Sequence, residues 1–214
     1  MNRLIKKILQ QIPDSVSVFS VNELAALEPG PDNVRHALVK RAISQGDLIH
    51  LRRGLYCLSP LYRKTKINTF AAAQLLYGPS YISLESALSA HGWIPEAVYG
   101  ITCVSNRAIR DFNTPIGHFS YRKIPQKVLY AGVEMVRDET GQSWYIASAL
   151  KALADYVFFH RLDWISSAPV TASLRVEMEQ LAELTLEDFE ELEGNYSSRR
   201  VKRFLSGLKK ELMA

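Results

Sequence analysis

The sequence predicts an α+β protein built from two different halves. Over residues 21–60 the residue pattern runs helix, tight turn, helix, strand, turn, strand. The rest of the chain instead alternates short helical runs with β-like runs. Basic charge is concentrated in the first half, so the two halves differ in charge as well as in residue pattern. We therefore expect an N-terminal domain over residues 1–66 and a mixed α/β C-terminal domain over residues 67–214.

The N-terminal elements follow from local signals. Residues 2–12 place apolar side chains at helical spacing, and a short strand is expected over residues 16–19. Ser20 and Glu23 form a capping-box pattern for a helix over residues 21–27. Two prolines and a glycine within residues 28–32 then break that helix.

A second helix is expected from Asp32 or Asn33 to about Gln45, with Gly46 free to end it in a left-handed conformation. Two β-like runs follow, at residues 48–51 and 55–58, joined by a turn that carries Arg52 and Arg53. This order of elements is typical of a winged helix-turn-helix, in which the second helix enters the major groove of DNA.

The second helix has two distinct predicted faces. An apolar stripe of Val34, Leu38 and Ala42 is suited to packing on the preceding helix. A polar stripe offers amide, imidazole and ammonium groups that can reach phosphates and base edges; it comprises Asn33, His36, Lys40 and Ser44, with Arg41 beside it. The alternative interpretation is a small helical domain with a solvated basic face.

Charge supports an anionic partner for the first half. The chain of 214 residues has a formal net charge of +4. Residues 1–66 hold 11 basic and 5 acidic residues, a balance of +6, whereas residues 67–214 hold 15 and 17, a balance of −2. A basic excess confined to the segment with the DNA-binding pattern points to nucleic acid.

The broken apolar runs of the N-terminal residues lead us to expect no secretory leader, and no run of apolar residues is long enough for a membrane span. Its two cysteines, Cys57 and Cys103, lie in apolar β-like runs and are expected to be buried free thiols. We therefore expect a cytoplasmic protein that needs neither a metal nor a cofactor.

The second half contains several predicted elements. Helices are expected over residues 69–77, 84–90, 144–159, 173–184, 186–192 and within 197–212. Strands are expected over residues 99–105, 118–124 and 132–137. Ser83 and Ser143 are the predicted caps of the second and third of these helices. In the strand over 118–124, His118, Ser120 and Arg122 share one face, and Phe119, Tyr121 and Lys123 share the other.

The C-terminal helix is strongly basic. It either pairs with the acidic segment 177–193 or forms a second DNA surface. The residues of that second surface would be Arg107, Arg110, Arg122, Arg199, Arg200, Lys202 and Arg203.

Three motifs, in order along the chain, carry a family resemblance. They are LIHLRRGLYCLSP at the end of the first half, then PSYISLESALSAHGWIPE, then GHFSYRKIP. Together with the C-terminal SSRRVKRFLSGLKKEL, they resemble the AbiEi-type antitoxins of bacterial type IV toxin–antitoxin systems, which act in abortive infection and phage defence. The resemblance covers nearly the whole chain.

The resemblance implies a DNA-binding autorepressor that recognises inverted repeats in its own promoter, bound as a monomer or weak dimer. It also implies an antitoxin that counters a nucleotidyltransferase-like toxin without forming a tight complex, and that has no catalytic residues of its own. The implied DNA-contacting residues are Asn33, Arg35, His36, Lys40, Arg41, Arg52 and Arg53.

Two other functions remain open from the residues alone. A metal-dependent nuclease would use acidic and basic groups such as Glu85, Lys151 and Asp155, but a helix ion pair explains the last two equally well. The other alternative is a stand-alone regulator or a protein-interaction module that lacks a toxin partner.

Overall fold

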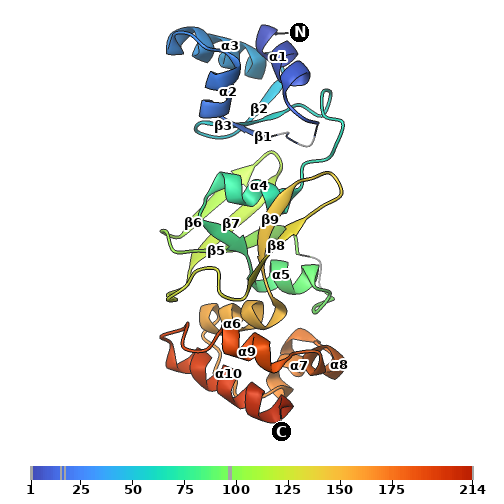
Figure 1. The fold of residues 1–214 in the computed structure, drawn as a ribbon, viewed down its shortest axis with the longest axis vertical. Helices are drawn as coiled ribbons and strands as arrows, with labels where there is room; N and C mark the ends of the chain where they lie inside the picture. Colours follow the sequence, from blue (N-terminus) through green and yellow to red (C-terminus); the bar gives the residue numbers. More distant parts are fainter. Residues whose placement is uncertain (1, 15, 17, 96–97, 214) are drawn as a thin grey trace.

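A computed structural model describes residues 2–14, 16, 18–95 and 98–213. Within these residues the chain is a mixed α+β protein with ten helices and two sheets. Figure 1 shows three tiers: α1–α3 with a small sheet at the N-terminal end, the larger sheet in the middle, and α6–α10 at the C-terminal end. The two termini lie at opposite ends of the molecule (Figure 1).

The first 58 residues form three helices and a three-stranded antiparallel sheet of order β1-β3-β2. The elements are α1 (Arg3–Gln11), β1 (Val18–Ser20), α2 (Val21–Leu27), α3 (Asp32–Ser44), β2 (Leu48–Arg52) and β3 (Leu55–Leu58). These agree with the predicted elements to within one or two residues, except that the strand predicted over 16–19 includes residue 17, which lies outside the described residues.

Local chemistry sets the ends of α2 and α3. The Ser20 hydroxyl accepts from the Glu23 amide, and the Glu23 carboxylate accepts from the Ser20 amide, so the predicted capping box is confirmed. Gly46 has φ +74°, and the amides of Gly46 and Asp47 donate to Ile43 O and Ala42 O at 3.0 and 2.9 Å. This is a Schellman motif, and it ends α3 where the glycine predicted.

The middle tier is a six-stranded sheet of order β6-β7-β5-β4-β9-β8, in which β5 is parallel to β7 and β4 to β9. Its strands are β4 (Ser80–Ile82), β5 (Gly100–Ser105), β6 (Arg110–Thr114), β7 (Gly117–Lys123), β8 (Val133–Arg137) and β9 (Ser143–Ala147). Helices α4 (Thr69–Leu76) and α5 (Leu84–Ala90) belong to the same tier.

The long helix predicted over residues 144–159 is wrong in its first third. Residues Ser143–Ala147 form β9, which pairs antiparallel with β8 and places Trp144 opposite Val136. Helix α6 begins only at Ala149 and runs to Phe159, and the hydroxyl of Ser148, not of Ser143, accepts from the Lys151 amide. Trp, Tyr and Ile favour a strand when a neighbouring strand is available. The strand predicted over residues 132–137 is that neighbour, and the two form an antiparallel hairpin that the helix prediction overlooked.

The C-terminal tier is helical: α7 (Ala168–Leu174), α8 (Met178–Ala182), α9 (Leu186–Glu191) and α10 (Arg199–Leu212). The single helix predicted over residues 173–184 is therefore also wrong. Arg175 has φ +55° and ends α7, and a capping box of Glu177 and Gln180 then starts α8. A left-handed arginine is uncommon, so the sequence carries no signal for this break.

Buried side chains form two clusters. One holds α1, α2 and α3 on the small sheet and includes Leu4, Ile8, Phe19, Leu24 and Val39. The other fills the middle and C-terminal tiers, yet it also includes Val18, Leu51, Leu55 and Cys57 from the small sheet. One face of the small sheet therefore packs together with the middle tier. Both cysteines are buried free thiols, as predicted.

None of the described helices is both long and apolar enough to cross a bilayer.

Candidate nucleic-acid interface

Helix α3 lies at the N-terminal end of the molecule, in the tier farthest from the C-terminus (Figure 1). Asn33, His36, Lys40 and Arg41 are exposed, and their side chains bond to no other residue of the described chain. Ser44 is also exposed, and its hydroxyl donates to Arg41 O at 2.9 Å. The predicted polar face of this helix thus keeps its donor groups available to a ligand.

The buried face of α3 differs from the predicted apolar stripe. Val34 is 50% exposed, whereas Val39 and Arg35 are buried together with Ala42. Leu38 and Ala42 do pack in the N-terminal cluster. The Arg35 guanidinium turns inward: its Nη1 donates to Glu28 O and Gly30 O, both at 3.4 Å, and its Nη2 pairs with Asp32. Arg35, expected on the exposed DNA-contacting face, instead stabilises the turn between α2 and α3.

Basic residues of α1 also serve the fold. The nearly buried carboxylate of Glu28 pairs with Arg3 and, at 2.8 Å, with Lys7. The hydrogen bond from Lys7, with further help from Arg3, holds the pKa of Glu28 below its ordinary value of 4.5 despite the opposing effect of burial. Two of the eleven basic residues counted in residues 1–66 are therefore engaged by a carboxylate of the fold, although the balance of +6 already includes that carboxylate.

The two arginines of the β2–β3 turn have different environments. Arg52 is half-buried and donates to Leu75 O at the end of α4 (3.1 Å) and to Arg53 O (3.0 Å), so it connects the hairpin to the middle tier. Arg53 is exposed, and within the described chain its side chain has no partner. Gly54, at φ +76°, closes the turn and accepts from the Val21 amide at 2.9 Å. Of the predicted pair, only Arg53 is available for DNA.

The residues of the predicted second DNA surface fall into two groups. Near β6 and β7, Arg107 donates to Gly78 O at 2.9 Å and lies over the Tyr77 ring, as does Arg110. On α10, Arg200 and Arg203 both pair with Asp163, at 3.2 and 3.1 Å. Arg199 and Lys202 are exposed.

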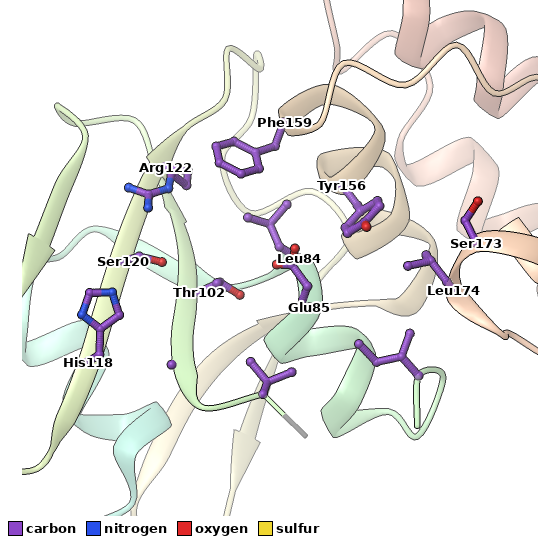
Figure 2. A pocket seen from close by; sticks show the side chains of 13 residues that line it. Leu84, Glu85, Thr102, His118, Ser120, Arg122, Tyr156, Phe159, Ser173 and Leu174 are labelled. Atoms are coloured by element: carbon purple, nitrogen blue, oxygen red, sulfur yellow. The ribbon is translucent and has the colours of Figure 1, made fainter. Parts of the chain in front are cut away.

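Arg122, the remaining member, lines a pocket instead. The cavity has a volume of ≈ 550 Å³ and lies between β5 and β7 on one side and α5, α6 and α7 on the other. Figure 2 shows His118, Ser120 and Arg122 along β7 facing Glu85, Tyr156 and Phe159. The alternation predicted for residues 118–123 is confirmed here, because Phe119 and Tyr121 are fully buried on the opposite face.

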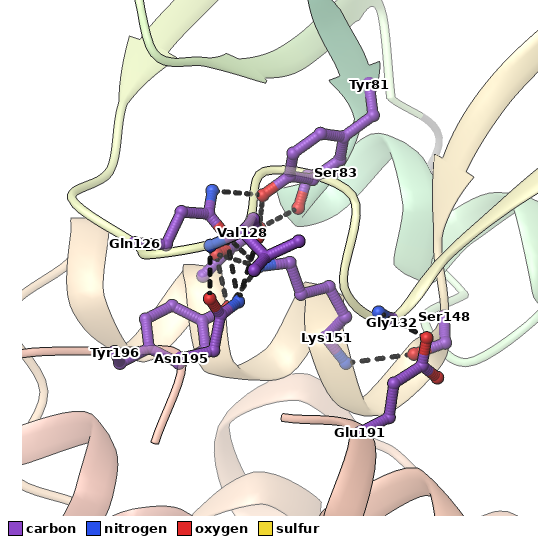
Figure 3. A network of polar contacts seen from close by, with 11 residues as sticks. Tyr81, Ser83, Gln126, Val128, Gly132, Ser148, Lys151, Glu191, Asn195 and Tyr196 are labelled. Atoms are coloured by element: carbon purple, nitrogen blue, oxygen red, sulfur yellow. Dashed lines mark hydrogen bonds and ion pairs between the residues drawn. The ribbon is translucent and has the colours of Figure 1, made fainter. Parts of the chain in front are cut away.

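A buried polar network joins the middle and C-terminal tiers (Figure 3). Asp155 accepts from Tyr81 and Ser83 (both 2.8 Å) and from Tyr196 (2.7 Å). Lys151 donates to Tyr196 at 2.8 Å, and its Nζ lies 3.7 Å from Asp155. Burial lowers the pKa of Lys151 and raises that of Tyr196, and the charge of Asp155 opposes the first shift and adds to the second.

The residues named for the nuclease alternative do not lie together: Lys151 and Asp155 belong to this buried network, and Glu85 does not. Lys151 and Asp155 are fully buried, and the described contacts connect them to tyrosine, serine and amide groups. Glu85 pairs outside this network with His160 at 2.9 Å. The predicted side-chain cap at Ser83 is wrong: its hydroxyl accepts from no backbone amide of α5 and donates instead to Asp155. The spacing of Lys151 and Asp155 indicated an ion pair, but nothing in the sequence indicated its burial.

No protein-family model matches this chain, and a search of curated proteins found no significantly similar sequence. Among the described residues, no three His, Cys, Asp or Glu side chains are grouped so that they can hold a metal ion.

Proposed function

We propose that residues 1–66 form a winged helix-turn-helix that binds promoter DNA, and that the chain is an autorepressor and antitoxin of a type IV toxin–antitoxin system. The observation that carries the DNA-binding part is the exposed, unpartnered polar face of α3 formed by Asn33, His36 and Lys40. Amide, imidazole and ammonium groups on a protruding helix are the groups that read base edges in the major groove.

The contact residues proposed here are fewer than the sequence predicted. Asn33, His36 and Lys40 would face the major groove, while Arg41 and Arg53 would meet phosphates. Arg35 and Arg52 are left out because their guanidinium groups already bond to backbone carbonyls. Symmetric inverted repeats would be read by two copies of this surface.

The antitoxin part rests on the sequence resemblance and concerns the remaining residues. In this proposal the middle and C-terminal tiers are required to neutralise a nucleotidyltransferase-like toxin, and no tight complex with that toxin is needed. This part is separable from DNA binding, so it has a test of its own.

DNA binding is tested by a gel-shift salt titration that compares the protein's own upstream promoter with a scrambled duplex of equal length. We expect the promoter to bind more tightly and its affinity to fall steeply as salt rises, because phosphate contacts release counterions. Arg53→Ala should weaken both duplexes and flatten the salt dependence. Lys210→Ala, which removes an exposed charge at the other end of the molecule, is the matched control.

Base readout is tested with His36→Ala and Lys40→Ala on a panel of operator variants. Each lost base contact should cost about 1–3 kcal/mol and relax the preference at one position. An equal loss on every duplex would assign these residues to the backbone, and equal weak binding of promoter and scrambled DNA by the native protein would reject the repressor.

The antitoxin role is tested by co-expression with a nucleotidyltransferase-like toxin encoded beside this gene, which the proposal requires to exist. We expect the full chain to restore growth. Growth that stays arrested with the full chain present would reject the antitoxin role and leave the repressor untouched.

A protein-interaction module is the second candidate, and one surface favours it. Met135 on the edge strand β8 is 66% exposed, and Tyr130 and Tyr145 form a ring pair at 4.9 Å on the same part of the molecule. Exposed apolar groups beside an open sheet edge mark contact surfaces. Light scattering of the native protein and of Met135→Arg tests self-association there; a constant monomer mass in both would count against it.

A further inference from the structure

The pocket between β7 and α6 contains a row of polar groups on one wall. Because side chains alternate along a strand, His118, Ser120 and Arg122 project from the same face of β7 (Figure 2). They offer an imidazole, a hydroxyl and a guanidinium in succession. Such a row can bind the several oxygens of one anionic group.

The hydroxyl of Ser120 is available to a ligand on this wall. The residue is only 5% exposed, yet its hydroxyl makes no hydrogen bond to any described residue. The oxygen itself is not among the fully enclosed side-chain atoms that lack a partner, so it is accessible and can accept a hydrogen bond from a ligand in the cavity or donate one to it. Ser120 lines the cavity.

Arg122 and His118, which flank Ser120 on this wall, have hydrogen-bonding groups that no described residue uses. Arg122 uses Nη1 for Asp111, at 3.1 Å, and within the described chain its Nε and Nη2 have no hydrogen-bond partner. His118 places Nδ1 2.7 Å from Asn113 Oδ1, which orients the ring and leaves Nε2 for another group. A phosphate would bind to this set by charge-assisted hydrogen bonds.

The opposite wall is aromatic and ends in a carboxylate. Phe159 is 39% exposed, and Tyr156 lines the cavity beside it. The Arg122 guanidinium carbon lies over one face of the Phe159 ring, 5.6 Å from its centroid, so a base would stack on the exposed remainder of the ring or displace that guanidinium. Flat heteroaromatic rings stack on such side chains. Glu85, held by His160 at 2.9 Å, provides an acceptor for an amino or hydroxyl group.

We propose that this pocket binds a mononucleotide, with its phosphate on the β7 row and its base against Phe159. The volume of ≈ 550 Å³ falls within the usual size of small-molecule sites, about 300–1,000 Å³. Leu84, which lines the pocket, has φ +54°, an uncommon conformation for a branched residue and one that recurs at ligand sites. The proposal does not depend on DNA binding by α3.

Isothermal titration of the full chain tests the proposal, with AMP, GMP, CMP and UMP as ligands and with adenosine and inorganic phosphate as partial probes. We expect at least one mononucleotide to bind about tenfold or more tightly than either partial probe, because only the whole ligand uses both walls. Arg122→Gln and Phe159→Ala should each weaken this binding about tenfold.

Two further variants make the test specific. Ser120→Val should block binding and leave the thermal midpoint almost unchanged, because the lost hydroxyl has no protein partner. Lys123→Gln removes a positive charge from the adjacent, opposite-facing position and should bind normally.

Three outcomes would overturn the proposal. They are no mononucleotide binding at millimolar concentration by folded protein, binding that survives both Arg122→Gln and Phe159→Ala, and phosphate binding as tight as that of the mononucleotide. Binding only of a 5′-phosphorylated oligonucleotide would also reject it, because the site would then recognise a strand end.

Discussion

Lys151 and Asp155 have lost all contact with water, and their hydrogen bonds must replace its solvation. Each charge is compensated by the other and by neutral donors and acceptors, among them Tyr81, Ser83 and Tyr196. A buried pair of this kind adds little net stability, but the loss of one member leaves an uncompensated charge in the interior.

We therefore predict that Asp155→Asn lowers the free energy of unfolding by about 3–5 kcal/mol. The double variant Lys151→Met/Asp155→Asn should lose about 1–3 kcal/mol less than the sum of the two single variants, because the unpaired ammonium is then gone. Urea unfolding measures all three. Additive single effects would mean that the pair is not coupled.

Glu28 adds a pH dependence whose sign follows from its environment. Its pKa is lowered from 4.5 in the folded protein, chiefly by the hydrogen bond from Lys7. The folded state therefore binds this proton less readily than the unfolded state, and stability is lost as the pH falls below 4.5 through the folded pKa. We predict that Glu28→Gln loses less stability than the native protein as the pH falls. Urea unfolding at a series of acidic pH values measures this difference. If the pH dependence of stability is the same in Glu28→Gln as in the native protein, Glu28 is not its source.

At the scale of elements, α10 approaches the chain at Ile165 so closely that only glycine fits. A Cβ on Gly207 would lie 2.0 Å from Ile165 O. Alanine is the better helix former by about 1 kcal/mol, so an open helix position would gain from the change. At Gly207 the close backbone contact outweighs this gain, so we expect alanine to destabilise the protein.

We predict that Gly207→Ala destabilises the protein by about 1–3 kcal/mol in chemical unfolding, because α10 must move away from the backbone at Ile165. Ser206→Ala on the exposed side of the same helix is the matched control and should be neutral or slightly stabilising. Stabilisation by Gly207→Ala would show that the helix is not held against this segment.

At the scale of the whole molecule, the small sheet and the middle tier share one cluster of buried side chains. Leu55 lies in that cluster, although it belongs to the β2–β3 hairpin. Arg52 adds a hydrogen bond from the same hairpin to the end of α4. The N-terminal tier should therefore not unfold independently of the rest.

Tryptophan fluorescence can test this, because Trp93, Trp144 and Trp164 all lie outside the N-terminal tier. We predict that fluorescence and far-ultraviolet circular dichroism report coincident unfolding transitions. Leu55→Ala should lower the free energy of unfolding obtained from either signal by about 2–5 kcal/mol. Leu61→Ala, at a residue that is 84% exposed, should change neither value by more than about 0.5 kcal/mol. Separate transitions would argue for independent tiers.

Local signals in the sequence determined the elements whose ends depend on near neighbours. Ser20 with Glu23, Gly46, and the alternation along residues 118–123 all predicted what the structure contains. These features act within a few residues, through capping bonds, left-handed backbone or strand pleating, so they can be read before the fold is known.

Tertiary structure alone decided the features that need a distant partner. Two missed features did not need a distant partner: residues 143–147 pair with β8, the strand just before them, and Arg35 bonds to the carbonyls of Glu28 and Gly30. In contrast, the Lys151–Asp155 network and the pocket at Ser120 join segments far apart in the sequence, and Tyr81 and Asp155 alone are 74 residues apart. Burial and desolvation depend on what surrounds a side chain, and a linear pattern does not contain that information.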